Sequence, residues 1–269
     1  MKYEFLQLSE RQAGVKQVTL NRESVHNAFH APLIQELIHV FSELQSDQDC
    51  RLVILTGNGH SFSAGADLNW MKSMVDYDFQ QNLEDSRQLA KLFQTIDHLV
   101  TPILGLINGP AYGGGTGLIS VCDFALCVDS ARFGFTETKL GLVPAVISPY
   151  VIRKIGESAA RAWFLSGDLF NAQQALQMGL VHQVVADTEF EKTGQELIEK
   201  FLKAAPLAAK ECKVFTKRVV QFLKEPSDFS MQKIEDYTCE TIARLRVTPE
   251  AQQGMQALLT KKPAPWVKS

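Results

Sequence analysis

The sequence predicts an α/β fold over roughly the first two thirds of the chain, followed by a helical region. Up to about residue 186, short apolar runs alternate with segments of helical periodicity, which is the pattern of an α/β chain. From about residue 189 to 259 helical periodicity continues, with breaks near three prolines, Pro206, Pro226 and Pro249. We therefore expect a core over residues 1–186 and a helical C-terminal region over residues 187–269.

The strands are predicted from apolar runs of five or six residues bounded by turn formers or polar residues. In chain order these runs are Tyr3–Leu8, Val15–Leu20, Leu52–Thr56, Ile103–Ile107, Phe124–Val128, Arg132–Thr136 and Val181–Val185. Helical segments lie between several of them, which is the alternation expected of an α/β chain.

Three helices have recognisable ends. Residues 32–45 place Pro32 in the first turn and carry one apolar face, formed by Leu33, Leu37, Val40, Phe41 and Leu44. Residues 171–178 begin at Asn171, a good N-cap, and stop at Gly179. Thr248, Pro249 and Glu250 supply a cap, a first-turn proline and a first-turn acid for the last helix.

Composition excludes several classes of protein. The net charge is −3 over 269 residues, without a block of like charges, so a nucleic acid is not an expected partner. No run of about 18 apolar residues predicts a membrane span, and the first residues do not resemble a signal or transit peptide. We expect a cytoplasmic protein.

Cysteine and histidine patterns indicate neither a disulfide framework nor a metal site. The five cysteines are odd in number and contain no CxxC pair: Cys50, Cys122, Cys127, Cys212 and Cys239. The six histidines are scattered, without a second ligand at metal spacing: His26, His30, His39, His60, His98 and His182. A reducing compartment and no metal are therefore expected.

Two glycine-rich turns, residues 57–68 and 108–118, each follow a predicted strand. Small residues allow backbone N–H groups to approach a ligand, and two converging N–H groups would form an oxyanion hole. The second turn leads into a predicted helix N-terminus, which favours negative charge. On glycine content alone, tight connections between a strand and a helix are the favoured interpretation of both turns.

Glu137 is the third candidate feature, about twenty residues beyond the second turn. A glutamate in apolar surroundings has a raised pKa and can act as an acid or a base. The alternative is a surface carboxylate paired with Lys139 or Arg132.

In combination these features resemble the enoyl-CoA hydratase/isomerase (crotonase) superfamily. The resemblance extends over nearly the whole chain and rests on Ser61–Leu68, Asn108-Gly109, Gly113–Gly115, Cys122-Asp123, Phe133, Glu137 and Leu140–Pro144, in that order. It implies a spiral of ββα units, a helical C-terminal region used for trimerisation, and a homotrimer or hexamer.

The resemblance also implies an acyl-CoA thioester as substrate, with no separate cofactor because coenzyme A is part of that substrate. The oxyanion hole maps to the backbone N–H groups of Ala66 and Gly114, which would stabilise a thioester enolate. The loop formed by Ala64, Gly65, Ala66, Asp67 and Leu68 would hold the adenine and pantetheine of coenzyme A. His26 and Lys261 are candidates for contacts to its phosphates.

One catalytic position departs from the pattern. Hydratases of the family place two glutamates over the double bond; the second maps to Glu137 and the first falls on Gly117, which would still line the substrate. Asp67 and the pair Glu84 and Asp85 are the nearest replacement acids. Alternatively Glu137 alone could take a proton from water and return one to Cα.

The acyl group and the reaction therefore stay open. Ser61–Lys72 and Gly141–Gly156 are similar to bacterial methylglutaconyl-CoA hydratases of leucine degradation. A Δ3-Δ2 enoyl-CoA isomerase needs only one glutamate, and a non-catalytic acyl-CoA-binding protein needs none. Three apolar side chains could line an acyl channel or only pack within their helix: Trp70, Met71 and Met74. Three cations could bind the carboxylate of a carboxylated acyl chain: Lys72, Lys139 and Arg153.

Overall fold

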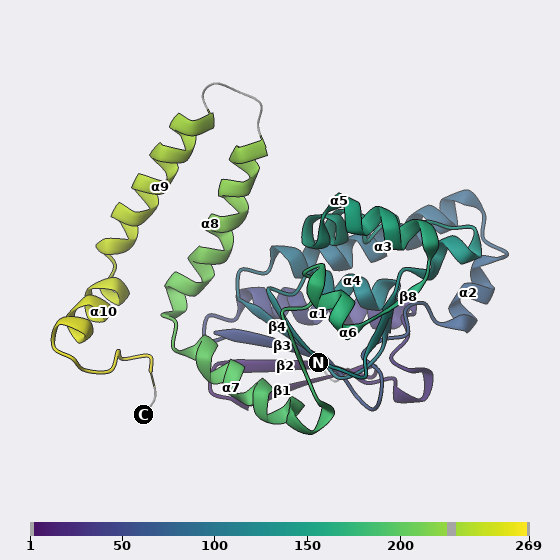
Figure 1. The fold of residues 1–269 in the computed structure, drawn as a ribbon, viewed down its shortest axis with the longest axis horizontal. Coiled ribbons are helices and arrows are strands. Elements are labelled where there is room, and N and C mark those ends of the chain that lie inside the picture. Colours follow the sequence, from purple (N-terminus) through teal and green to yellow (C-terminus); the bar gives the residue numbers. More distant parts are fainter. Residues whose placement is uncertain (1–2, 225–229, 268–269) are drawn as a thin grey trace. The chain divides into compact units, whose positions relative to one another are not determined.

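The computed structural model describes residues 3–224 and 230–267. The chain divides into two compact units (Figure 1): Met1–Leu99 with Ile103–Glu196, and Val100–Pro102 with Leu197–Ser269. The boundary predicted after residue 186 precedes α7 (Phe190–Leu202), whereas the division between the units falls inside this helix.

A six-stranded sheet with the order β1-β2-β3-β4-β6-β9 forms the centre of the first unit. Its strands are β1 (Leu6–Gln12), β2 (Val15–Leu20), β3 (Leu52–Gly57), β4 (Ile103–Ile107), β6 (Phe124–Val128) and β9 (Gln183–Val185). Only β1 and β2 pair antiparallel; the other pairs are parallel. All five residues of β4 are buried, as expected for a parallel strand covered on both faces.

The predicted bounds of β2, β4 and β6 are confirmed. The first predicted strand, Tyr3–Leu8, starts too early and ends too early. The antiparallel register pairs Leu6 with Leu20 and continues to Gln12, so the length of β1 is decided by its partner. Val181–Val185 also starts too early, and Arg132–Thr136 ends too late because Thr136 opens the 3-10 helix η2 (Thr136–Leu140).

A second, three-stranded sheet joins β5 (Ala111–Tyr112), β7 (Arg132–Gly134) and β8 (Leu169–Asn171) in that order. Neither β5 nor β8 is predicted from the sequence, because runs of two and three residues carry no periodicity. This sheet brings the second glycine-rich turn next to the strand that leads into Glu137.

The described residues of the first unit also contain six α-helices before α7. They are α1 (Ala31–Ser46), α2 (Leu68–Met74), α3 (Phe79–His98), α4 (Gly114–Ser120), α5 (Ser148–Ser166) and α6 (Ala172–Gln177). The predicted apolar face of α1 is confirmed, since all five of its named residues are buried. Asn171 caps α6 with a capping box, and Gly179 adopts a φ of 80° beyond its end.

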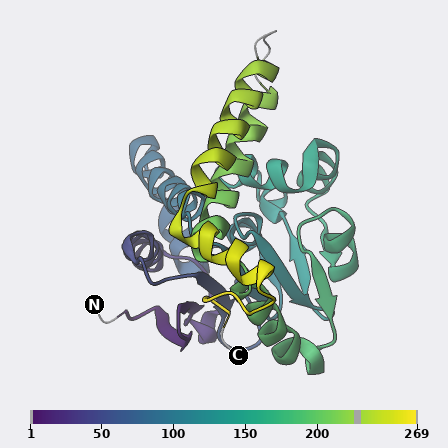
Figure 2. The ribbon, with the colours of Figure 1, turned by 90° about the vertical axis from the view of Figure 1, so that its left-hand side faces the viewer.

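The second unit is helical, as the sequence predicts. It contains the end of α7, then α8 (Pro206–Lys224), α9 (Ser230–Arg246) and α10 (Pro249–Leu259), which Thr248 caps. The break predicted near Pro226 lies outside the described residues. Helices α8 and α9 lie side by side (Figure 1) and overlap in the view of Figure 2, and the rings of Phe215 and Tyr237 stack between them with their centroids 5.6 Å apart.

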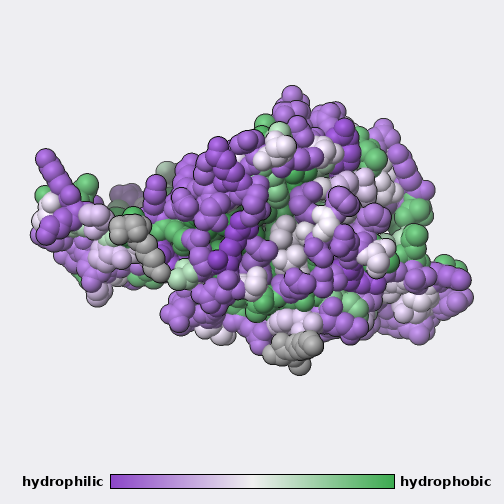
Figure 3. All heavy atoms as spheres, turned by 90° about the horizontal axis from the view of Figure 1, so that it is seen from below, coloured by the Kyte–Doolittle hydropathy of each residue, from purple (hydrophilic) through white to green (hydrophobic). Residues whose placement is uncertain are grey.

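The surface in Figure 3 is mainly hydrophilic, with hydrophobic residues in small patches. No helix within residues 3–224 and 230–267 has both the length and the apolar character to cross a bilayer.

Candidate active site

The two glycine-rich turns lie side by side in the structure. The N–H groups of Phe62 and Ser63 donate to the carbonyl of Pro110 at 3.0 and 3.2 Å, and Tyr112 N–H donates to Ser63 O at 3.0 Å. Glycine is required for this approach, because a Cβ on Gly109 would stand 2.1 Å from the carbonyl oxygen of His60. Backbones about fifty residues apart in the sequence are thus joined into one wall of the site.

Ala66 presents its backbone N–H at this wall. A short parallel bridge holds the residues on either side of it, through Phe29 N–H to Gly65 O at 2.6 Å and Asp67 N–H to Phe29 O at 2.8 Å. Ala66 itself is exposed, and its N–H meets no acceptor within the part of the chain that the structure describes.

Gly114, the first residue of α4, offers a second such donor. Among the described residues its N–H also meets no acceptor, as is usual in the first turn of a helix. A Cβ on Gly65 would lie 2.7 Å from Tyr112 O and 3.8 Å from Gly113 Cα, so the two turns stay in contact up to these donors. Two free N–H groups on adjacent backbones can bind an oxygen that gains negative charge.

Glu137, at the start of η2, places its carboxyl beside the second turn. A Cβ on Gly113 would stand 3.1 Å from Glu137 Oε1. The other oxygen, Oε2, is buried and has no hydrogen-bond partner among the described residues. Burial raises the pKa of Glu137, although a hydrogen bond from its own backbone N–H opposes the rise. Such a carboxyl is suited to proton transfer.

The alternative of a surface ion pair for Glu137 is wrong. Lys139 Nζ lies 2.9 Å from Asp168 Oδ1 instead. The guanidinium of Arg132 donates to two backbone carbonyls, those of Ser130 and Ala131.

Gly117, to which the resemblance maps the first glutamate, is buried in α4. A Cβ there would stand 2.5 Å from Ile147 Cγ2 and 2.9 Å from Phe93 Cζ. These two apolar side chains fill the space that a second carboxylate would need. The sequence carries no local sign of this wall, because Phe93, Gly117 and Ile147 belong to three separate helical or loop segments.

Asp67 and Glu84 do not supply the missing acid. Asp67 caps α2 and accepts from Arg22, and although burial tends to raise its pKa, the hydrogen bonds from Arg22 and from the backbone of Asn69 and Trp70 hold it below its ordinary value. Glu84 is exposed and lies beside Arg87 and Gln88 on α3.

Asp85 is the remaining acid on α3. Its Oδ2 is buried without a hydrogen bond in the described part of the chain, as is the indole nitrogen of Trp70. Burial raises the pKa of Asp85, and the nearby Trp70 N–H opposes this. Asp85 and Phe93, the side chain next to Gly117, are eight residues apart on one helix, so their positions along its axis differ by about 12 Å.

The predicted coenzyme A contacts are only partly brought together. His26 is exposed and lies against the first turn: its ring contacts Ser61 Oγ at 3.1 Å, and its carbonyl accepts from Ala64 N–H at 2.8 Å. Leu68 is 81% exposed at the end of that turn. Lys261 belongs to the second unit, and its contact with coenzyme A stays a prediction.

Two of the three cations considered for an acyl carboxylate have other partners. Lys139 pairs with Asp168 and Arg153 with Asp97. Lys72, exposed on α2, forms no ion pair within the described residues. Residues 3–224 and 230–267 contain no group of three or more His, Cys, Asp or Glu able to hold a metal ion.

Residues 10–269 match the family model described as enoyl-CoA hydratase/isomerase. The chain is 31% identical to 2,3-dehydroadipyl-CoA hydratase of Escherichia coli, over 94% of each chain. It is 33% identical to a short-chain-enoyl-CoA hydratase of Clostridium acetobutylicum, over 79% of this chain and 81% of the relative. The crystal structure of an enoyl-CoA hydratase from Shewanella pealeana superposes with a TM-score of 0.91 at 37% identity, over 98% and 97% of the two chains.

Proposed function

The chain belongs to the enoyl-CoA hydratase/isomerase family, and we propose on this basis that it adds water to a 2-enoyl-CoA thioester to give a 3-hydroxyacyl-CoA. Its spiral α/β fold is that of the family, as the TM-score shows. The proposal is carried by two N–H groups on touching turns, those of Ala66 and Gly114, which have no acceptor among the described residues. Beside the second turn lies Glu137, whose buried Oε2 has no partner among the described residues.

The proposed reaction uses one carboxylate. The thioester oxygen accepts hydrogen bonds from Ala66 N–H and Gly114 N–H, which stabilise the enolate more than the substrate. Glu137 takes a proton from water as the water oxygen bonds to Cβ, and the electrons of the double bond move to the thioester oxygen. Glu137 then returns a proton to Cα, so the net change is the addition of one water.

The acyl group proposed is 3-methylglutaconyl, which would place the enzyme in leucine degradation. The sequence likeness to methylglutaconyl-CoA hydratases supports this, and a relative is named for dehydroadipyl-CoA, whose acyl chain also ends in a carboxylate. Lys72 is the cation proposed to meet that carboxylate, because Lys139 and Arg153 already pair with acids.

A second candidate function is Δ3-Δ2 isomerisation, favoured by the single carboxyl at the site. Loss of absorbance of the conjugated thioester on incubation with crotonyl- or methylglutaconyl-CoA supports hydration. A gain of this absorbance with a 3-enoyl-CoA, without hydration of 2-enoyl-CoA, would replace hydratase by isomerase. If the protein converts neither 2-enoyl-CoA nor 3-enoyl-CoA, the remaining candidate is a non-catalytic acyl-CoA-binding protein.

We also propose a homotrimer or hexamer assembled through residues 187–269, in the cytoplasm, with no cofactor beyond the coenzyme A of the substrate. Exposed apolar side chains of the C-terminal helices support an oligomer, among them Leu258 and Leu259, each 79% exposed. Light scattering after size exclusion gives the mass that tests this.

The pH dependence of kcat/KM should show the raised pKa of Glu137. The proposed mechanism needs the carboxylate, so activity falls as the pH drops through the pKa of Glu137. Because burial raises this pKa, the midpoint should lie above 4.5, the ordinary value. Measurements of kcat/KM from pH 4 to 8, with circular dichroism to confirm folding, test this. A value of kcat/KM that does not change down to pH 4.5 would contradict it.

Replacing Asp85 by Asn tests whether a second acid takes part. We expect kcat to stay within about threefold of the wild type, because one carboxylate is enough for proton transfer in the proposed mechanism. A loss of about 100-fold or more, with unchanged acyl-CoA binding, would instead assign Asp85 an acid–base role.

A further inference from the structure

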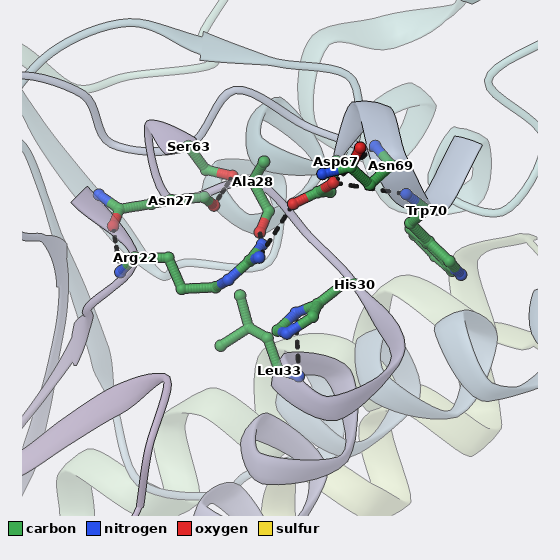
Figure 4. Close-up of polar contacts among 9 residues, drawn as sticks. All are labelled: Arg22, Asn27, Ala28, His30, Leu33, Ser63, Asp67, Asn69 and Trp70. Atoms are coloured by element: carbon green, nitrogen blue, oxygen red, sulfur yellow. Dashed lines mark hydrogen bonds and ion pairs between the residues drawn. The ribbon is translucent and has the colours of Figure 1, made fainter. Parts of the chain in front are cut away.

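Arg22 joins the two backbone segments that hold Ala66 (Figure 4). Its Nη1 donates to the carbonyl of Ala28 at 2.5 Å, and its Nη2 donates to Asp67 Oδ2 at 2.9 Å. Both ends of this ion pair are largely withdrawn from water, with the Arg22 side chain 14% exposed and that of Asp67 7% exposed. One guanidinium thus bonds to both sides of the bridge that flanks Ala66.

The Arg22 side of this contact is itself held in place. Arg22 N–H donates to Asn27 Oδ1 at 2.9 Å, and Asn27, fully buried, donates its Nδ2 to the carbonyls of Asn58 and Ser61 at 2.9 and 2.8 Å. Ser63 Oγ donates to Asn27 O at 2.9 Å. Through Asn27, the loop that carries Arg22 is therefore hydrogen-bonded to the first glycine-rich turn at Asn58, Ser61 and Ser63.

The Asp67 side is held by the start of α2. Asp67 Oδ1 accepts from Asn69 N–H at 2.8 Å and from Trp70 N–H at 3.4 Å, which already completes an N-cap. Capping alone does not require Arg22. Burying an ion pair also costs desolvation, so its presence is weak evidence for a gain in stability.

A role in positioning the Ala66 N–H explains the ion pair of Arg22 and Asp67 better than a gain in folding stability does. An oxyanion donor must lie about 2.7–3.1 Å from the oxygen that it stabilises. The Ala66 N–H belongs to the peptide between Gly65 and Ala66, so a displacement of Asp67 is transmitted through the Ala66 backbone to that peptide and rotates it. The bridge to Phe29 limits this rotation, and Arg22 closes the bridge from the side-chain end.

We propose that Arg22 and Asp67 are positioning residues, which fix the Ala66 N–H for the thioester oxygen. This inference rests on the proposed function, since it assigns a task within the same site. Neither side chain is given a contact with the reacting atoms.

The test uses the full-length protein with Arg22→Met, Asp67→Asn, the double variant and Arg22→Lys. Asn retains the N-cap, so Asp67→Asn removes the charge without removing the start of α2. A matched control is Arg11→Met, which breaks the partly buried contact of Arg11 with Glu191 on another part of the first unit. The readouts are kcat, KM and the absorption maximum of bound 4-dimethylaminocinnamoyl-CoA, which shifts to longer wavelength when its carbonyl is polarised.

We expect Arg22→Met and Asp67→Asn each to lower kcat about 10- to 100-fold, the size expected from a small misplacement of a catalytic group, with KM within about threefold. The kcat of the double variant should be no lower than that of the less active single variant, because each single change already removes the contact between Arg22 and Asp67. Arg22→Met and Asp67→Asn should each reduce the red shift of the bound probe. Arg22→Lys should recover part of kcat and part of the red shift, whereas Arg11→Met should change neither.

An unchanged red shift and kcat in Asp67→Asn and Arg22→Lys would overturn the positioning role even if Arg22→Met fails to fold. Losses of kcat that multiply in the double variant would overturn it as well. A wild-type protein that binds the probe without a red shift and hydrates no enoyl-CoA would overturn the proposed function, and with it this inference. If the wild type hydrates enoyl-CoA and the Arg22 and Asp67 variants match its kcat and red shift, this inference is overturned but the proposed function is not.

Discussion

Glu137→Gln is expected to lower kcat about 1,000-fold, within the range for loss of a general acid–base group, while acyl-CoA binding stays nearly intact. Glutamine keeps the shape of the side chain but cannot take a proton from water or return one to Cα. The proposed oxyanion donors, Ala66 N–H and Gly114 N–H, are backbone groups and are not altered. Hydration rates and binding of a saturated acyl-CoA, measured by calorimetry, separate the two effects.

The stability of the same variant provides a second check. Burial raises the pKa of Glu137, so the folded state disfavours the charged form at neutral pH. Removing this charge should leave the melting temperature at pH 7 equal to or above that of the wild type. Glu157→Gln, at an exposed position on α5, is the control for a neutralised carboxylate. A variant that retained substantial hydratase activity would contradict the assignment of Glu137.

Gly117→Glu is expected to destabilise the protein rather than restore a two-carboxylate site. The new side chain would meet Ile147 Cγ2 and Phe93 Cζ, which stand 2.5 and 2.9 Å from the position of its Cβ. Overpacking costs about 1–3 kcal/mol, and burial of a carboxyl without a partner adds to this. Urea unfolding of the wild type and the variant measures the change.

A double variant separates space from chemistry at this position. Ile147→Ala removes the nearest clashing methyl, so Gly117→Glu/Ile147→Ala should be less destabilised than the sum of the two single changes. The single variant should hydrate no faster than the wild type. A stable Gly117→Glu protein with a faster hydration rate would show that the apolar wall is absent and that the enzyme favours two acids.

Many elements of the fold could be predicted from local pattern. The bounds of β4 and β6 follow from uninterrupted apolar runs, and those of β2 from a short segment that begins and ends with apolar residues. The starts of α6 and α10 follow from Asn171 and Thr248. All these signals lie in neighbouring residues. The short strands β5 and β8 could not, since two or three residues become a strand only when a distant partner bonds to them.

The sequence by itself determined the α/β core, the helical C-terminal region, two glycine-rich turns and one candidate glutamate. The tertiary structure decided that Glu137 is a buried carboxyl and not a surface ion pair, that apolar side chains occupy the space beside Gly117, and that Arg22 reaches Asp67. The physical reason is distance along the chain. Caps and periodicity depend on residues a few positions apart, whereas burial, pKa and free N–H donors depend on segments that only folding brings into contact.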